Sequence, residues 1–264
     1  MNSLFGDFKK SIHRAEFWGY STWLDIMTDY RRMHLGLGWA LIPPIVYILG
    51  LGYMYSILMG RGLDPMTYYI HLGIGWALWK MLTNVLNTAA PVFNKHKSFI
   101  MDGHTCFTDF VLRVVSRALF NFIFAFAVVF AILLVDSDIH WWNMLTMLVT
   151  LPIYVINLVW LTVVVALLGA RYPDVRELIK TLLMFGFFIT PILWSAQSMP
   201  PGSMRGLIAR FNPAFHYIEM VRAPVMGLPI EHATYVVVTC MTVGGWLLAA
   251  VLYKRYARFV PLWA

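Results

Sequence analysis

Six apolar stretches, each long enough to cross a lipid bilayer, occupy most of this chain. They cover roughly residues 35–59, 66–90, 111–135, 143–169, 178–196 and 233–253. A helix of about 20 apolar residues spans the hydrocarbon core of a bilayer, so the 264 residues leave little room for a soluble domain. The sequence therefore predicts an all-α integral membrane protein. We expect one membrane domain over residues 1–264, with six transmembrane helices over residues 35–253.

Positive charge is distributed unevenly between the loops. If the N-terminus is cytoplasmic, fifteen Lys and Arg residues fall on the cytoplasmic side, four fall on the opposite side, and Lys80 lies within a span. Cytoplasmic loops of membrane proteins are enriched in Lys and Arg. This bias predicts that both termini are cytoplasmic, and it accounts for the net charge of +7 without a nucleic-acid partner.

Residues 16–33 precede the first span and show an amphipathic pattern. Tyr20, Trp23 and Met27 recur at three- and four-residue steps, which is typical of one helix face. The aromatic residues favour a helix that lies in the membrane interface. An ordinary N-terminal extension of the first span is the alternative. Within that span, Pro43 and Pro44 predict a kink or a break, because proline lacks the N–H that a helix needs.

The segment 197–232, after the fifth span, is long but keeps apolar runs broken by prolines. These runs are too short to span a bilayer, so they predict one or two short re-entrant helices in the outer leaflet, shielded by protein. A plain periplasmic loop is the alternative. Glu219 and Arg222 stand three residues apart in this segment, and that spacing predicts an ion pair on one helix face.

The sequence carries none of the chemistry that an enzyme or an ion-coupled carrier needs. No acidic residue falls in the middle of a predicted span, whereas proton- and sodium-driven carriers generally need ionisable groups there. The chain has no His-Glu-x-x-His zinc motif and no glycine-rich phosphate loop. We therefore expect no catalytic residue, no metal site and no cofactor in this chain, so any energy source must be another polypeptide.

Lys80 is the exception to this apolar interior. A lysine near the middle of a span is a candidate functional residue, which would attract an anionic group such as a phosphate. The alternative is that its long side chain reaches the interface or a water-filled cavity.

Three segments, in order, resemble the membrane subunits of ABC-type polysaccharide exporters of the ABC-2 class. Residues 29–43 hold a basic pair followed by Leu-Gly, Trp and Pro, and residues 171–175 read Arg-Tyr-Pro-Asp-Val. The third segment joins Phe-Ile-Thr-Pro-Ile-Leu-Trp-Ser at 188–195 to the Asn-Pro, Glu and Arg residues of 211–224. The resemblance covers about residues 16–258.

The resemblance implies a homodimer of this chain bound to two copies of a cytoplasmic ABC ATPase, which would bind ATP and Mg²⁺. It also assigns candidate site residues by position. The candidate ATPase contacts are Arg31, Arg32, Asn94, Lys95, Lys97, Arg171 and Asp174. The candidate periplasmic gate residues are Asn212, Pro213, Glu219 and Arg222.

The class implies a lipid-linked polysaccharide, O-antigen or capsular polysaccharide, as cargo, exported across the bacterial inner membrane. Aromatic rings stack well on sugar rings, although they also fill helix contacts and interfacial belts. Our candidates for the translocation path are Lys80, Tyr53, Trp76 and Phe188. Two alternatives stay open, namely a permease of this class for teichoic acid, a lipid or a drug, and a membrane enzyme of glycolipid assembly.

Overall fold

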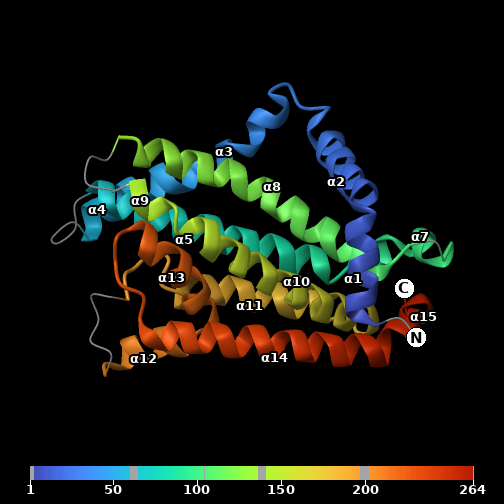
Figure 1. Cartoon of the computed structure of the whole chain (residues 1–264). Coiled ribbons are helices and arrows are strands. Elements are labelled where there is room, and N and C mark those ends of the chain that lie inside the picture. The colour runs from blue at the N-terminus through green and yellow to red at the C-terminus, as the bar shows by residue number, and fades with distance from the viewer. Residues whose placement is uncertain (1–2, 60–64, 104, 136–140, 197–201, 264) are drawn as a thin grey trace.

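The chain folds into one elongated bundle of helices. The computed structural model describes residues 3–59, 65–103, 105–135, 141–196 and 202–263. Helix makes up 84% of it, and those ranges contain no strand, so the predicted all-α class is confirmed. Four long helices run along the bundle (Figure 1), namely α5 (Pro65–Ala89), α8 (Phe107–Leu133), α10 (Met147–Arg171) and α14 (His232–Tyr256). Twenty-five helical residues are about 38 Å long, enough to cross a hydrocarbon core of about 30 Å.

Within the described residues, four segments are long and apolar enough to cross a membrane. They are Gly36–Tyr55, Phe107–Leu133, Trp142–Arg171 and His232–Trp263. They correspond to the first, third, fourth and sixth predicted spans. The second and fifth predicted spans, 66–90 and 178–196, fall outside this set, and each does so for its own reason.

The helix of the second predicted span, α5, is long enough but too polar. It carries His71, Lys80, Asn84 and Asn87. The structure explains His71, because α8, α10, α11 (Val175–Ile189) and α13 (Pro213–Val225) all pack against α5, and most of its side chains between positions 70 and 81 are buried. Lys80 and Asn87 are exposed on the single subunit. A helix that is shielded by its neighbours does not have to present an apolar surface to lipid on every face.

The helix of the fifth predicted span, α11 (Val175–Ile189), contains only 15 residues. That is about 23 Å of helix. Residues 190–196 follow α11 without helical structure. Their backbone groups therefore need hydrogen-bond partners from other helices, which are described with the site below.

The first predicted span changes helical type several times along its length. A 3₁₀ turn, η1 (Gly36–Ala40), leads into α3 (Ile42–Ile45), a π-helical turn, η2 (Val46–Leu51), and α4 (Gly52–Met59). The change of type surrounds Pro43 and Pro44, which cannot donate backbone hydrogen bonds. The segment stays helical through the prolines, so the predicted kink or break takes the form of a change of helical type with a wide turn after them.

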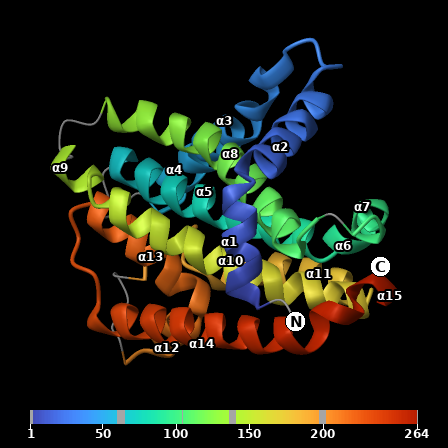
Figure 2. The same cartoon turned by 45° about the vertical axis from the view of Figure 1, so that its right-hand side comes forward.

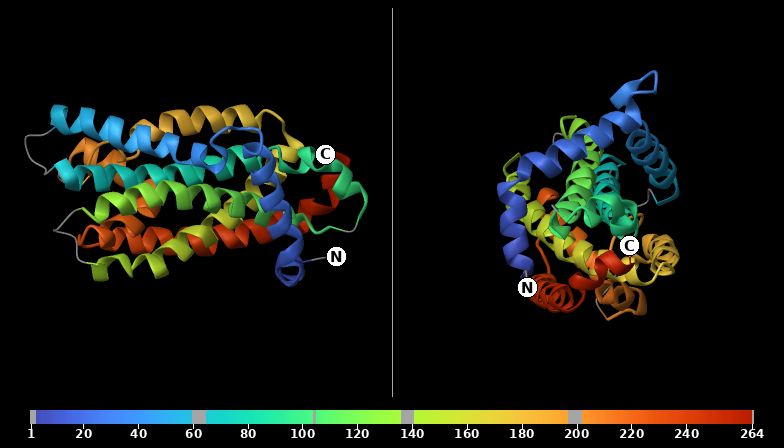
Figure 3. Two further views of the ribbon diagram at one scale, coloured as in Figure 1. Left: turned by 90° about the horizontal axis from the view of Figure 1, so that it is seen from above. Right: turned by 90° about the vertical axis from the view of Figure 1, so that its right-hand side faces the viewer.

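Both ends of the described chain lie at the same end of the bundle, which we call the inner end; the opposite end is the outer end (Figure 1). Two helices precede the first span, α1 (Leu4–His13) and α2 (Ala15–Tyr30). They cross the bundle rather than follow it (Figures 2 and 3), with α1 against α8 and α14, and α2 against α8. The predicted interface helix thus corresponds to α2, whereas α1 has no counterpart in the sequence analysis.

Short helices close both ends of the bundle. At the inner end these are α6 (Val92–Lys95), α7 (Lys97–Met101), η3 (Ala257–Phe259) and α15 (Val260–Trp263). At the outer end they are α9 (Trp141–Met144), α12 (Met204–Phe211) and α13 (Pro213–Val225). Within the predicted segment 197–232, residues 197–201 lie outside the described residues. The remainder holds two short helices, and α13 packs among α5, α10 and α14.

Small residues allow the long helices to approach closely. A Cβ atom at Gly169 of α10 would overlap the backbone of Ala90, and one at Gly245 of α14 would overlap the ring of Trp160. Glycine at these two positions therefore sets how near α10 lies to its neighbours.

Candidate functional site

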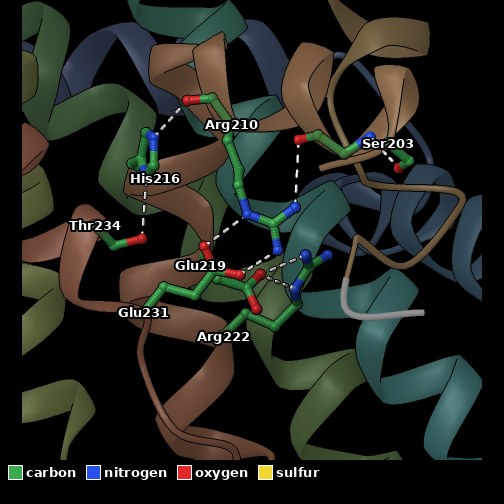
Figure 4. Close-up of polar contacts among 8 residues, drawn as sticks. Ser203, Arg210, His216, Glu219, Arg222, Glu231 and Thr234 are labelled. Carbon is green, nitrogen blue, oxygen red and sulfur yellow. Dashed lines mark hydrogen bonds and ion pairs between the residues drawn. The ribbon is translucent and has the colours of Figure 1, made fainter. Parts of the chain in front are cut away.

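A buried arginine, Arg222, lies at the centre of a polar network in the outer half of the bundle. Its side chain is 2% exposed, and its Nη2 donates to Glu219 Oε2 at 2.6 Å along one face of α13 (Figure 4). The predicted ion pair between these residues is confirmed. Arg222 Nη1 donates to the carbonyl oxygen of Pro191 at 2.8 Å and contacts His71 Nε2 at 3.1 Å. We call these four residues the outer network.

The outer network joins three helices through one guanidinium group. His71 comes from α5, and Pro191 follows the end of α11. Because a guanidinium group can only donate, His71 Nε2 accepts, and the imidazole is neutral. Tyr68, one turn before His71, also donates to the carbonyl oxygen of Leu193 at 2.8 Å. Two carbonyl groups of the non-helical backbone after α11, those of Pro191 and Leu193, are thereby satisfied by side chains of α13 and α5.

Burying this ion pair is costly, so its partners matter individually. Moving charges out of water costs several kcal/mol per ion, and excellent geometry is needed to recover that cost. Arg222 achieves it with a carboxylate, a carbonyl and an imidazole. Loss of any one of these partners leaves a charge or a donor without compensation in the interior.

A second group of contacts fixes α12, α13 and the start of α14 relative to one another. Arg210 forms a two-pronged ion pair with Glu231, with Nε–Oε2 at 2.9 Å and Nη2–Oε1 at 2.5 Å (Figure 4). His216 contacts Thr234 Oγ1 through Nδ1 at 2.9 Å and the carbonyl oxygen of Arg210 through Nε2 at 2.8 Å. These residues were not singled out by sequence, because the partners of each long-range pair stand 18 or 21 positions apart.

Asn212 and Pro213 form the beginning of α13. The Asn212 side chain accepts from the backbone N–H of Ala214 at 3.0 Å, which caps the helix, and Pro213 occupies the first helical position. Asn212 Nδ2 also donates to Thr190 Oγ1 at 2.7 Å. The four candidate gate residues therefore all lie on α13 or at its N-cap, and two of them, Asn212 and Arg222, contact the segment that leaves α11.

The interface helix α2 is attached to α8 by matched charges. Arg113 Nε donates to Asp25 Oδ2 at 2.7 Å, and Arg117 pairs with Asp29. Each pair of like residues is four positions apart, so two charges on one helix face meet two opposite charges on another. That equal spacing is the signal by which sequence reasoning could have found these contacts.

Helix α1 is attached to the inner ends of α8 and α14. Ser11 Oγ lies 2.6 Å from Thr108 Oγ1, and Tyr253 donates to Asp7 Oδ2 at 2.7 Å. Both contacts are buried. The N-terminal helix is thereby fixed to the bundle.

The candidate ATPase contacts all have exposed side chains near the inner end or on the turn after α2. These are Arg31, Arg32, Asn94, Lys95, Lys97, Arg171 and Asp174. Arg171, at the end of α10, lies over the ring of Trp263 in α15 at 5.3 Å, and α15 packs against α7. The structure thus brings Arg171 towards the helix that holds Lys97. Arg31 and Arg32 lie apart from them, beyond the end of α2.

The four candidate path residues do not share one environment. Trp76 is 5% exposed and stacks on Tyr47 with ring centroids 5.2 Å apart. Lys80, Tyr53 and Phe188 lie on the surface of the single subunit. Within the described ranges, no group of three or more His, Cys, Asp or Glu residues is arranged to hold a metal ion.

Comparisons with known proteins connect this architecture to a single family. The profile of the family described as ABC-2 type transporter matches residues 18–226. The O-antigen export system permease protein RfbA of Myxococcus xanthus is 18% identical over 189 residues, which is 72% of this chain and 72% of that protein. The polysialic acid transport protein KpsM of Escherichia coli is 20% identical over 206 residues, 76% of this chain and 78% of that protein.

Proposed function

This chain belongs to the ABC-2 type transporter family, and we propose that it is the permease subunit of an ATP-driven exporter of lipid-linked polysaccharide in the bacterial inner membrane. The observation that carries the proposal is the family match over residues 18–226, together with two relatives named for O-antigen export and polysialic acid transport. The functional unit we propose is two copies of this chain with two copies of a cytoplasmic ATPase that binds ATP and Mg²⁺.

In the proposed topology all six predicted spans cross the membrane, including α5 and α11. The inner end and both termini face the cytoplasm, and α12 and α13 lie at the outer leaflet. The protein packing around α13 and the satisfied carbonyl groups of Pro191 and Leu193 after α11 support this arrangement. Non-helical backbone and short helices are stable at membrane depth when protein surrounds them.

A continuous series of contacts supports a mechanical role for α5. The ATPase would contact α6, α7 and the turn after α2; α2 is joined to α8 by the two Arg–Asp pairs. Helix α8 packs along α5, and α5 carries His71, which contacts Arg222 of the outer network. Movement of the inner end would therefore reach α13 through α5. The resulting movement of α13 would open a path for the glycan.

The test is ATP-dependent glycan movement in vesicles that contain this chain and its ATPase. We expect radiolabelled lipid-linked glycan to accumulate on the far side only when both proteins and ATP are present. Vesicles with this chain alone should move no glycan and hydrolyse no substrate.

In cells, deletion of the gene for this chain should remove glycan from the surface and leave it inside. Normal surface glycan would reject polysaccharide as the cargo and leave teichoic acid, a lipid or a drug. Turnover of a lipid-linked sugar by the chain alone would indicate an enzyme instead.

A further inference from the structure

A polar cavity lies at the inner end, apart from the outer network. Its volume is about 370 Å³, and it lies between α2, α5, α6 and α8. Three amides and a hydroxyl group line it, together with cationic and imidazole side chains. The residues that carry the argument are Asn84, Asn87, Asn121, Lys95, His96 and Arg113.

The amides belong to polar stripes on two neighbouring helices. Asn84, Asn87 and Thr88 stand three and four positions apart on α5, so they share one helix face. On α8, Arg113 and Asn121 are separated by eight positions, with Arg117 between them on the same face. Helices α5 and α8 pack side by side, and both stripes border the same cavity. Polar groups on membrane helices are costly and mark functional sites by default.

The amides have unused hydrogen-bonding capacity. Among the residues that the structure describes, no protein group is within hydrogen-bond distance of the side-chain amide of Asn84, Asn87 or Asn121. Asn157 of α10 shows the contrast, because its amide contacts Thr242, Trp160 and Tyr217. Asn157 is buried and saturated, whereas Asn84 and Asn121 are half-buried and Asn87 is exposed, so their amides can be reached by a ligand in the cavity.

The charge of the cavity favours an anion. Lys95, Arg113 and Arg117 line it together with the carboxylate of Asp25. Arg113 pairs with Asp25, and Arg117 pairs with Asp29 beside the cavity. Arg113 uses Nε and Nη2 for Asp25, at 2.7 and 2.5 Å, which leaves Nη1 for a ligand. Lys95 has no ion-pair partner in the described part of the chain. With both arginines paired, Lys95 supplies the excess positive charge of the cavity.

His96 adds a hydrogen-bond acceptor. Burial lowers the pKa of its imidazole, so the ring is neutral at pH 7. Its Nδ1 lies 2.9 Å from the carbonyl oxygen of Val92 and must donate to it. Nε2 is then an acceptor, suited to a hydroxyl group. The cavity thus combines anion-binding cations with donors and acceptors for hydroxyl and amide groups, which is the chemistry of a sugar phosphate.

We propose that this cavity binds the phosphorylated sugar next to the lipid anchor of the exported glycan, on the cytoplasmic side. The inference rests on the proposed function and adds a ligand site to it. A volume of about 370 Å³ is at the small end of ligand pockets, which span about 300–1,000 Å³, so it suits a short headgroup rather than a polymer. The exposed face of α2, with Tyr20, Trp23 and Leu24, would place lipid beside it.

The proposal is tested by direct binding to the full chain with its ATPase in phosphatidylcholine nanodiscs. The probe is tritiated farnesyl diphosphate N-acetylglucosamine. Filling the cavity with Asn84→Leu and Asn121→Leu together, or removing one cation with Lys95→Gln, should weaken binding at least tenfold. Lys97→Gln is the matched control, because Lys97 is exposed, lies outside the cavity and has the same candidate ATPase role. Wild-type affinity in the double variant would overturn the proposal.

Competitors distinguish the possible ligands. N-acetylglucosamine 1-phosphate should displace the probe, and phosphatidylglycerol should not. If phosphatidylglycerol displaces the tritiated probe as effectively as the unlabelled probe does, the cavity binds an ordinary anionic lipid, and the assignment to a sugar phosphate is overturned. If thermal unfolding shows that the double variant is not folded, the single variants Asn87→Ala and Lys95→Gln test the site instead. Wild-type affinity for the probe in both of them rejects the site.

Glycan export in vesicles is measured in parallel. Probe binding that depends on the cavity supports the site, even if wild-type vesicles fail to export and the proposed function fails. Export by wild type, with equal probe binding in all variants, rejects the cavity and leaves the proposed function intact.

Discussion

At the scale of single residues, Arg222 is buried more deeply than an exposed loop of the membrane surface would allow. It is 2% exposed and contacts Glu219, His71 and the backbone of Pro191. The i,i+3 contact with Glu219 is local, so the sequence predicts it. The contact with His71 joins residues 151 positions apart, and no local pattern indicates it. The residue was therefore identified from sequence, but its surroundings were not.

Replacing Arg222 with Ala should abolish or strongly lower export while leaving membrane insertion intact. The change leaves the Glu219 carboxylate buried without its partner, and breaking a buried ion pair costs about 3–5 kcal/mol. Export in vesicles and thermal unfolding in detergent measure the two effects. Lys9→Ala, on the exposed surface of α1, is the control. Unchanged surface glycan in Arg222→Ala cells would remove this residue from the mechanism.

Two adjacent glycines of α14 provide a test of helix packing. A Cβ atom at Gly245 would overlap the ring of Trp160, whereas one at Gly244 would meet nothing within 4 Å. Gly245→Ala should destabilise the protein by about 1–3 kcal/mol, the usual cost of overpacking. Gly244→Ala should be neutral or stabilising by about 0.5–1 kcal/mol, because alanine favours a helix. Thermal unfolding compares them, and equal stabilities would contradict the close contact between α10 and α14.

At the scale of elements, apolar length alone located the long helices. The predicted spans coincide with the first-span helices and with α8, α10 and α14, because lipid-facing helices must be apolar. Sequence reasoning did not find α1, since residues 4–13 form a short helix whose attachment depends on distant partners such as Tyr253. Nor could it give the end of α11, where the chain leaves the helix at Ile189 and side chains of other helices satisfy its backbone.

The charge pairs between α2 and α8 should couple the interface helix to the bundle. Reversing one charge with Arg113→Asp should lower ATP-dependent export several-fold, because two carboxylates would then face each other. The double change Asp25→Arg with Arg113→Asp should restore most of it. The pair is partly buried, so the single variant should unfold at a lower temperature than the wild type, and the double variant should recover most of that loss. Equal export in the single and double variants would contradict a coupling role.

Whether α5 crosses the membrane can be tested by labelling, without reference to its apolar or polar residues. Cysteines placed singly at Thr67 and Asn94, in a background with Cys106 and Cys240 changed to Ser, would lie near opposite ends of α5. In intact cells we expect a membrane-impermeant maleimide to label position 67 and to leave position 94 unlabelled. Labelling of both positions would show that α5 does not cross.

At the scale of the whole molecule, one copy of the chain leaves Lys80 exposed in the middle of α5. A charge at this depth in lipid costs at least about 2.5 kcal/mol, so a second copy or an aqueous path should cover it. The single bundle could be predicted from sequence, but which of its surfaces face lipid could not, because large apolar side chains are exposed on many of its helices.

Native mass spectrometry of the chain in detergent should therefore detect a species with the mass of two copies. Adding the ATPase should give a complex with two copies of each protein. A preparation that exports glycan with one copy of this chain per complex would contradict the proposed assembly.

The π-helical turn at Val46–Leu51 has a consequence for the outer part of the first span. A π turn accommodates one more residue than an α turn, and one residue corresponds to a rotation of about 100° about the helix axis. If the wide turn tightened into an ordinary α turn, the piece from Gly52 to Met59 would swivel by roughly a quarter of a circle. Tyr53, which is exposed on the single subunit, would then face a different direction around the helix axis, while the part of the span before the turn kept its position.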